Sequence, residues 1–271
     1  NTFYAEFQAY KEELAARSKI NIQIGPEVSS DIEKSIIDAA TGTEKFLSSL
    51  GFSFDSNIPI HVYANYDLLL EAYASINGID KTTADLHWQR GSVIAMTGYQ
   101  LSLFINLSSP SWEERDEANQ ALIVAQELFT LLQFQQRKGS LYGQGDQVPS
   151  GGPVWLREGS KRLIGFKAVN WQEKLSFDST LESHINSAMS ATYNLAQMET
   201  HNEFYSLGRM EDYIGLVAAN FLSKDLVKFI EYYTAIGDGL SWQGAFTQTF
   251  GRTVEVFYEE FAAYQRNGYQ P

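Results

Sequence analysis

The sequence predicts an α+β protein in which a mixed sheet with helices comes first and a run of helices follows. Residues that alternate between apolar and polar, as strands do, are confined to the first 108 positions. Beyond them, apolar residues recur at helical spacing up to about residue 266. The 271 residues are 44% hydrophobic and 14% aromatic, which is enough apolar material for a sizeable core.

Helices and strands alternate over the first 78 residues. The capping-box pair Ser30 and Glu33 marks the start of one helix. The alternation of Ile20, Ile22 and Ile24 marks a strand. In order, we expect a helix over 2–17, a strand over 20–24, a helix from 30 to about Gly51, a strand over 58–62 and a helix over 66–76 that stops near Gly78.

The sheet is expected to end with two adjacent strands within 88–108, on either side of Gly98. Ser111 with Glu114 forms a further capping box, so a long helix is predicted from there to about Lys138. Residues 139–152 are rich in glycine and polar side chains, which is typical of a loop.

The remainder of the chain is predicted to be helical. Pro153 suits the first turn of a helix that runs to about Val169. Further helices fill 178–266, with breaks near Gly208, Gly237 and Gly251. We therefore predict an N-terminal α/β subdomain over 1–110 and a helical subdomain over 111–271, which together form one compact unit.

Charge and composition exclude several functions. The net charge is −13 and no run of Lys or Arg exists, so a nucleic-acid partner is not expected. The absence of cysteine excludes disulfides, thiolate metal sites and a cysteine nucleophile. No apolar run reaches 18 residues, so no transmembrane segment is expected. Because the first residue is Asn1, we expect a processed or trimmed chain.

Two segments carry the most specific pattern, VAQELFTLLQ at 124–133 and GGPVWLREGS at 151–160. Zincin metalloproteases place H-E-x-x-H on a helix, where two histidines at i and i+4 bind zinc and the Glu acts as general base. Here the corresponding residues are Gln126, Glu127 and Thr130, and a second helix carries Glu158 in the context W-L-R-E-G.

Together these segments resemble a gluzincin zinc metallopeptidase of the peptidase MA-like kind that lacks both motif histidines. The segments at 212–223 and 239–264 resemble the helical tail of the same family. The resemblance implies a zincin-like fold with an active-site-like cleft between the sheet subdomain and the helical subdomain. It also implies that Glu127 stands at the general-base position and Glu158 at that of the third zinc ligand. An extracytoplasmic location, secreted or anchored through a removed N-terminal segment, is implied as well.

The departure from the family pattern predicts that zinc is absent. Gln126 and Thr130 offer neutral oxygens, which are poor zinc ligands beside imidazole, and the remaining histidines form no i, i+4 pair. Replacement by a calcium ion is a weaker alternative. Without a cation the two carboxylates would repel, so we expect Gln126 and Thr130 to donate hydrogen bonds to Glu127 or Glu158. Arg157 is expected to point elsewhere, because it is adjacent to Glu158 in sequence.

The later helices offer two tyrosines for the role of oxyanion stabiliser, which active gluzincins often fill with Tyr or His. Tyr213 is the preferred candidate over Tyr205, and packing is the alternative explanation for Tyr213. A serine nucleophile is discounted because no G-x-S-x-G turn exists, and the Glu127/Glu158 pair alone does not indicate a glycosidase.

The resulting hypothesis is a catalytically inactive, metallopeptidase-like protein that binds or assembles with a protein or peptide partner through the remnant cleft or its surface. Amide hydrolysis by Glu127 alone would lack the Lewis acid that zinc supplies. The alternative hypothesis is a peptidase-type hydrolase with an altered or non-zinc active site that uses Glu127.

Overall fold

The computed structural model describes residues 18–91, 93–98, 101–138, 149–191, 193–206 and 210–270. The helix predicted over 2–17, most of the loop predicted over 139–152 and the break predicted near Gly208 lie outside these residues. The described part is a mixture of helices with one small mixed sheet, as the α+β prediction expects. The chain divides into two compact units, Asn1–Leu131 and Leu132–Pro271. This division falls within helix α6, while the last strand ends at Asn106.

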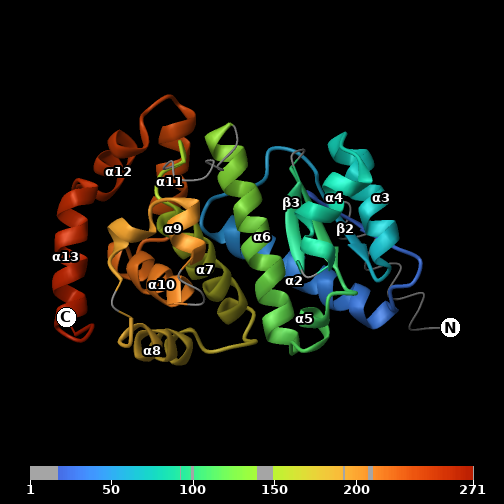
Figure 1. Ribbon diagram of the computed structural model, residues 1–271, viewed down its shortest axis with the longest axis horizontal. Helices are drawn as coiled ribbons and strands as arrows, with labels where there is room; N and C mark the ends of the chain where they lie inside the picture. Colours follow the sequence, from blue (N-terminus) through green and yellow to red (C-terminus); the bar gives the residue numbers. More distant parts are fainter. Residues whose placement is uncertain are drawn as a thin grey trace. The chain divides into compact units, whose positions relative to one another are not determined.

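The first unit contains a four-stranded sheet with the order β1-β2-β4-β3 (Figure 1). The β1–β2 and β2–β4 pairs are parallel, and the β3–β4 pair is antiparallel. The elements are β1 (Ile20–Ile24), α2 (Ser30–Ser49), β2 (Ile58–Tyr63), α3 (Tyr66–Asn77), α4 (Lys81–His87), β3 (Ala95–Gly98), β4 (Ser102–Asn106), α5 (Pro110–Glu113) and α6 (Glu117–Arg137).

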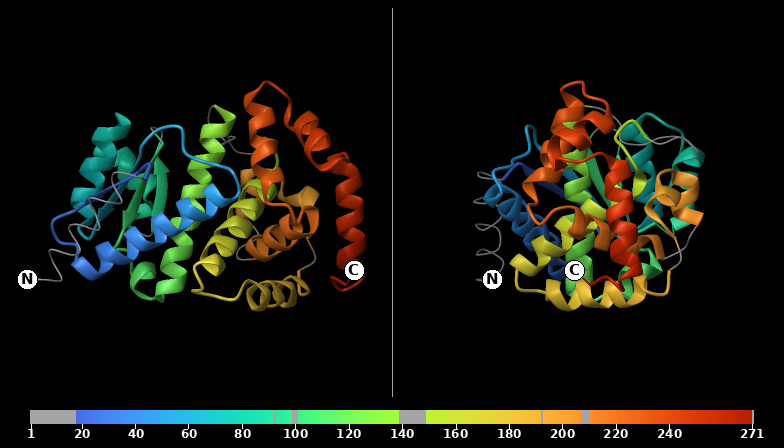
Figure 2. Two further views of the ribbon diagram at one scale, coloured as in Figure 1. Left: turned by 180° about the vertical axis from the view of Figure 1, so that it is seen from behind. Right: turned by 90° about the vertical axis from the view of Figure 1, so that its left-hand side faces the viewer.

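The two faces of the sheet carry different helices, as both side views in Figures 1 and 2 show. Phe104 of β4 lies in a cluster with Leu69, Tyr73 and Trp88, so α3 and α4 cover that face. Residues one position along a strand point to the opposite face. Leu103 and its register partner Thr97 therefore belong to the other face, where α2 and α6 lie.

Most strand and helix predictions in this unit are confirmed, and two helix starts are corrected. The cap of α2 is Ser29, whose side chain accepts a hydrogen bond from the Ile32 amide, rather than Ser30. The helix predicted to start at Ser111 is interrupted, because α5 ends at Glu113 and α6 begins at Glu117. The Asp116 carboxylate accepts a hydrogen bond from the Asn119 amide (2.8 Å), which caps the second start.

The second unit is helical over its described residues. Its helices surround aromatic side chains, among them Phe246, Phe257 and Phe261, each at most 1% exposed. The elements are α7 (Val154–Trp171), α8 (Phe177–Ala188), the 3-10 turn η2 (Leu195–Met198), α9 (His201–Ser206), α10 (Met210–Leu222), α11 (Val227–Gly237), α12 (Trp242–Phe250) and α13 (Val254–Arg266).

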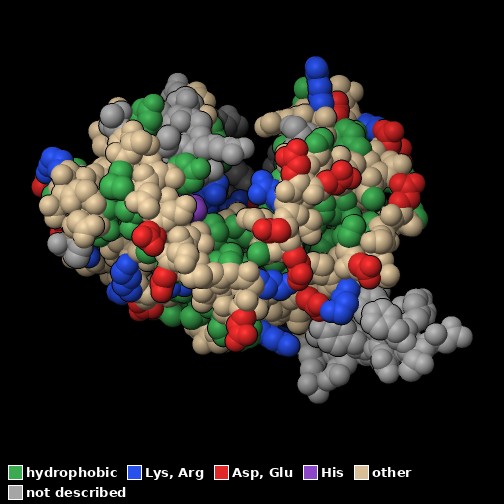
Figure 3. All heavy atoms as spheres, turned by 90° about the horizontal axis from the view of Figure 1, so that it is seen from below, with side chains coloured by type: hydrophobic (Ala, Val, Ile, Leu, Met, Phe, Trp, Pro, Cys, Tyr) green, Lys and Arg blue, Asp and Glu red, His purple; other side chains and the backbone are tan. Residues whose placement is uncertain are grey.

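Two surface properties concern possible partners. Among the described residues, no helix combines the length and apolar character needed to cross a membrane. Acidic side chains are spread over the face shown in Figure 3 rather than gathered in one patch.

Helices α7 and α10 cross at Gly159 and Gly215, and the contact is asymmetric. A Cβ atom on Gly159 would lie 2.2 Å from the Gly215 carbonyl oxygen, whereas one on Gly215 would meet nothing closer than 3.5 Å. Alanine raises helix propensity by up to about 1 kcal/mol at either position. We expect Gly159→Ala to lower the free energy of unfolding by about 1–3 kcal/mol.

Gly215→Ala is the matched control, because it adds the same methyl group from the other side of the same crossing. It should leave the free energy of unfolding within about 1 kcal/mol of wild type. Urea denaturation of both variants measures the difference. Equal stability of the two variants would contradict the close approach of α7 to the Gly215 carbonyl.

Candidate functional site

The residues that the sequence singles out lie on two helices. Gln126, Glu127 and Thr130 are on the part of α6 that belongs to the first unit, and Glu158 is on α7 in the second unit.

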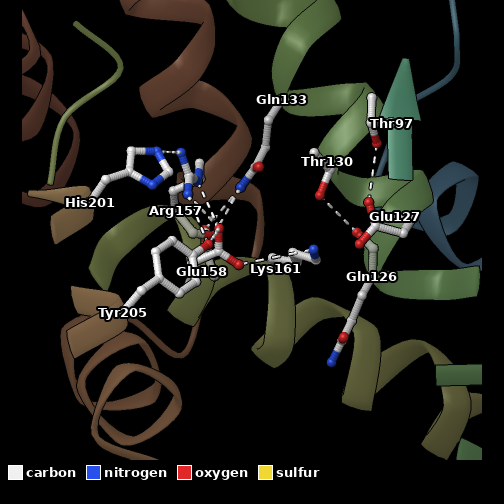
Figure 4. Close-up of polar contacts among 11 residues, drawn as sticks. Thr97, Gln126, Glu127, Thr130, Gln133, Arg157, Glu158, Lys161, His201 and Tyr205 are labelled. Carbon is white, nitrogen blue, oxygen red and sulfur yellow. Dashed lines mark hydrogen bonds and ion pairs between the residues drawn. The ribbon is translucent and has the colours of Figure 1, made fainter. Parts of the chain in front are cut away.

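Glu127 is bonded to the edge strand of the sheet. The hydroxyl of Thr97, in β3, donates to Glu127 Oε2 over 3.1 Å (Figure 4). Thr97 is buried, at 7% exposure, which limits the movement of this donor. The carboxylate of Glu127 is therefore positioned as an acceptor against β3.

Among the described residues, no carboxylate accepts a hydrogen bond from the side chains at the two histidine positions. The Thr130 hydroxyl donates to the backbone carbonyl of Gln126 over 3.1 Å, one helical turn back. The Gln126 amide nitrogen is buried and has no hydrogen-bond partner among the described residues. The predicted network of Gln126 and Thr130 with Glu127 or Glu158 is thus wrong.

The carboxylate of Glu158 is paired with its sequence neighbour. Arg157 Nε donates to Glu158 Oε1 over 2.8 Å, and the second guanidinium contact to the same oxygen is 2.6 Å (Figure 4). The side chains are only 5% and 15% exposed. The expectation that Arg157 points elsewhere is wrong. Its side chain is long enough to fold back, and burial makes an unpaired charge costly.

Three further side chains surround this pair. The Tyr205 hydroxyl donates to Glu158 Oε1 over 3.3 Å, and Lys161 Nζ lies 3.9 Å from Oε2. His201 Nε2 lies 3.2 Å from the Arg157 NH1 nitrogen. The Tyr205 and His201 contacts join residues more than 40 positions apart, so no local sequence pattern could have indicated them.

These contacts determine the charge state of Glu158. Burial by itself raises the pKa of its carboxyl. The charges of Arg157 and Lys161, with the hydrogen bond from Arg157, outweigh burial and lower the pKa to about 2. Glu158 is consequently ionised at every physiological pH.

A second layer of hydrogen bonds fixes the turn of α7 that carries Arg157. Gln133 Nε2 donates to Ser160 Oγ over 3.1 Å and to the Arg157 carbonyl over 3.4 Å. The Ser160 hydroxyl donates to the same carbonyl over 3.1 Å. Gln133 and Ser160 are almost fully buried, so this network is part of the packed interior of the second unit.

Tyr213, the preferred oxyanion candidate, packs against a different residue. Its ring lies edge-on to His184, with centroids 5.1 Å apart. His184 in turn contacts Phe166, with centroids 5.4 Å apart. Of the two tyrosines considered, the one with a hydrogen bond to Glu158 is Tyr205.

The donor set does not fit zinc. Thr130 uses its hydroxyl within its own helix, Gln126 offers a neutral amide, and the Glu158 carboxylate is already bonded to a guanidinium. Within the part of the chain that the structure describes, no group of three or more His, Asp or Glu side chains could hold a metal ion. What the second unit does present is an ionised carboxylate whose charge is neutralised by side chains.

No model of a known protein family matches the chain, and no curated protein matches its sequence.

Proposed function

We propose that this chain is a catalytically inactive, metallopeptidase-like protein whose role is to bind or assemble with a protein or peptide. The proposal rests on the resemblance of the α6 and α7 segments to gluzincins. The observation that carries it is the ion pair between Arg157 and Glu158. In the family pattern Glu158 would contribute a charged ligand to zinc, and here a guanidinium already neutralises that charge.

The chemistry of Glu127 supports the same conclusion. A general base in this family acts on a water molecule whose pKa a metal ion has lowered. Gln126 and Thr130 replace both imidazoles that would hold such an ion. Glu127 can still accept the hydrogen bond from Thr97, but a carboxylate alone does not supply the Lewis acid on which the zincin mechanism depends.

Metal analysis together with a peptidase assay tests the proposal. We expect protein purified without chelator to contain far less than one zinc per chain. We also expect it to cleave unstructured protein substrates no faster than the Glu127→Gln variant does. Glu231→Gln, a change at an exposed carboxylate of α11, is the control for nonspecific effects of charge removal.

One combination of results would overturn the proposal in favour of a hydrolase. In that combination, wild type and Glu231→Gln are both active as peptidases, and Glu127→Gln is inactive. Stoichiometric zinc in the wild-type protein would also reject it, because the donor set would then hold a metal despite the Arg157 pair.

A further inference from the structure

The contact between His201 and Arg157 requires a neutral imidazole. A guanidinium can only donate hydrogen bonds, so His201 Nε2 must be the acceptor in the 3.2 Å contact with NH1. A protonated imidazole has donors at both nitrogens and would face Arg157 with a second positive charge. Proton binding to His201 and the hydrogen bond to Arg157 therefore exclude each other.

Several titratable or charged groups among the described residues lie near His201. Arg157 and Glu158 face it from α7, and the Tyr205 ring of its own helix stacks on it with centroids 5.4 Å apart. Glu203 of α9 is bonded to the Thr200 hydroxyl over 2.8 Å. The adjacent turn η2 has the sequence LAQM and contributes no titratable side chain.

Burial, and next the charge of Arg157, lower the pKa of His201, while Glu158 acts in the opposite direction. A histidine with a lowered pKa in the folded protein stabilises the fold above its ordinary value of about 6.5. That contribution is lost as the pH falls below this value.

We propose that His201 is a proton-sensitive latch that holds α9 on α7 when neutral and releases it when protonated. The helix is six residues long, and two of its side chains, His201 and Tyr205, contact the Arg157–Glu158 pair. Because Glu158 stays ionised far below the range in which histidine titrates, the ion pair with Arg157 persists while α9 is released.

Hydrogen exchange of the full chain between pH 7.5 and pH 5 tests this latch. After correction for the intrinsic exchange rate, protection of the α9 amides is expected to fall severalfold relative to α10 on acidification. His201→Gln should abolish this fall, because a glutamine carbonyl accepts from Arg157 at any pH.

His184→Gln is the matched control from the same unit. His184 Nδ1 lies 2.8 Å from the Thr180 carbonyl, to which it can only donate, so protonation is compatible with that contact. This variant should retain the pH dependence of α9. Persistence of the fall in His201→Gln would overturn the proposal. So would unchanged α9 protection in wild type at pH 5, the result expected if the imidazolium pairs with Glu158 instead.

Discussion

Replacement of Arg157 by methionine is expected to lower the free energy of unfolding by about 3–5 kcal/mol, the usual cost when one partner of a buried ion pair is removed. Methionine retains most of the aliphatic volume, so the change isolates the loss of the guanidinium. Glu158 would then keep a carboxylate that is only 15% exposed, with Lys161 at 3.9 Å as a weaker cation nearby. Urea denaturation monitored by circular dichroism measures the loss.

Two further variants distinguish loss of the ion pair from loss of packing. Arg157→Met combined with Glu158→Gln removes both charges, so most of the lost stability should return. Lys161→Met, which breaks the longer contact to Glu158, should cost about 1 kcal/mol or less. If the double variant is as unstable as Arg157→Met, the guanidinium stabilises the protein through packing or its contact with His201 and not through the Glu158 charge.

The pH dependence of stability gives an independent measure of the same pair. The pKa of Glu158 is lowered from its ordinary 4.5 to about 2, so its contribution is complete above pH 4.5 and is lost as the pH falls towards 2. The shift corresponds to about 3 kcal/mol. In Arg157→Met the loss of stability between pH 4.5 and pH 2 should be smaller than in wild type. An unchanged loss would mean that other carboxylates cause it.

Local sequence patterns were sufficient to predict most of the helices and strands. The alternation of Ile20, Ile22 and Ile24 correctly placed β1, and Gly78 correctly ended α3 in a left-handed conformation. The residue at which a helix begins was harder to predict where several neighbouring residues can serve as the N-cap. The residue that caps α2 is Ser29 and not the predicted Ser30. The residue that caps α6 is Asp116 and not the predicted Ser111. A capping residue is selected by backbone geometry, which adjacent serines and aspartates satisfy almost equally well.

The polar contacts around Glu158 could not be predicted in the same way. Neighbouring residues on a helix do not normally face each other, and this rule failed for Arg157 because its flexible side chain can turn back to a buried carboxylate. His201 and Tyr205 reach the pair from α9 through tertiary packing. The sequence identified Glu158 as a residue of interest but not the side chains that neutralise it.

Gln126→His combined with Thr130→His is expected to raise the zinc affinity of the chain well above that of wild type. Both positions lie on α6 four residues apart, so the two imidazoles would share one face of the helix. The resemblance to gluzincins implies that Glu158 would provide the third ligand. Competition with a chromophoric zinc chelator measures the dissociation constant, and either single histidine variant is the control.

Arg157 determines how large this gain can be. A metal ion bound to Glu158 would lie close to the guanidinium, which already neutralises this carboxylate through two contacts to Oε1, so the positive charge of Arg157 opposes metal binding. Adding Arg157→Met to the two histidines should therefore tighten zinc binding at least tenfold, which corresponds to about 1.4 kcal/mol. Because zinc binds only the folded state of such a site, it should also raise the melting temperature of this triple variant.

Glu158→Gln in the same background tests the third ligand directly. If the resemblance is correct, Gln126→His, Thr130→His and Glu158→Gln together should bind zinc far more weakly than the two histidines with Glu158 intact, since a neutral amide replaces a carboxylate ligand. Circular dichroism must show that each variant is folded before its affinity is compared. Equal affinity with and without the Glu158 carboxylate would mean that α6 binds the ion through its two imidazoles alone. The gluzincin arrangement of α6 and α7 would then be rejected, while the ion pair and its effect on stability would stand.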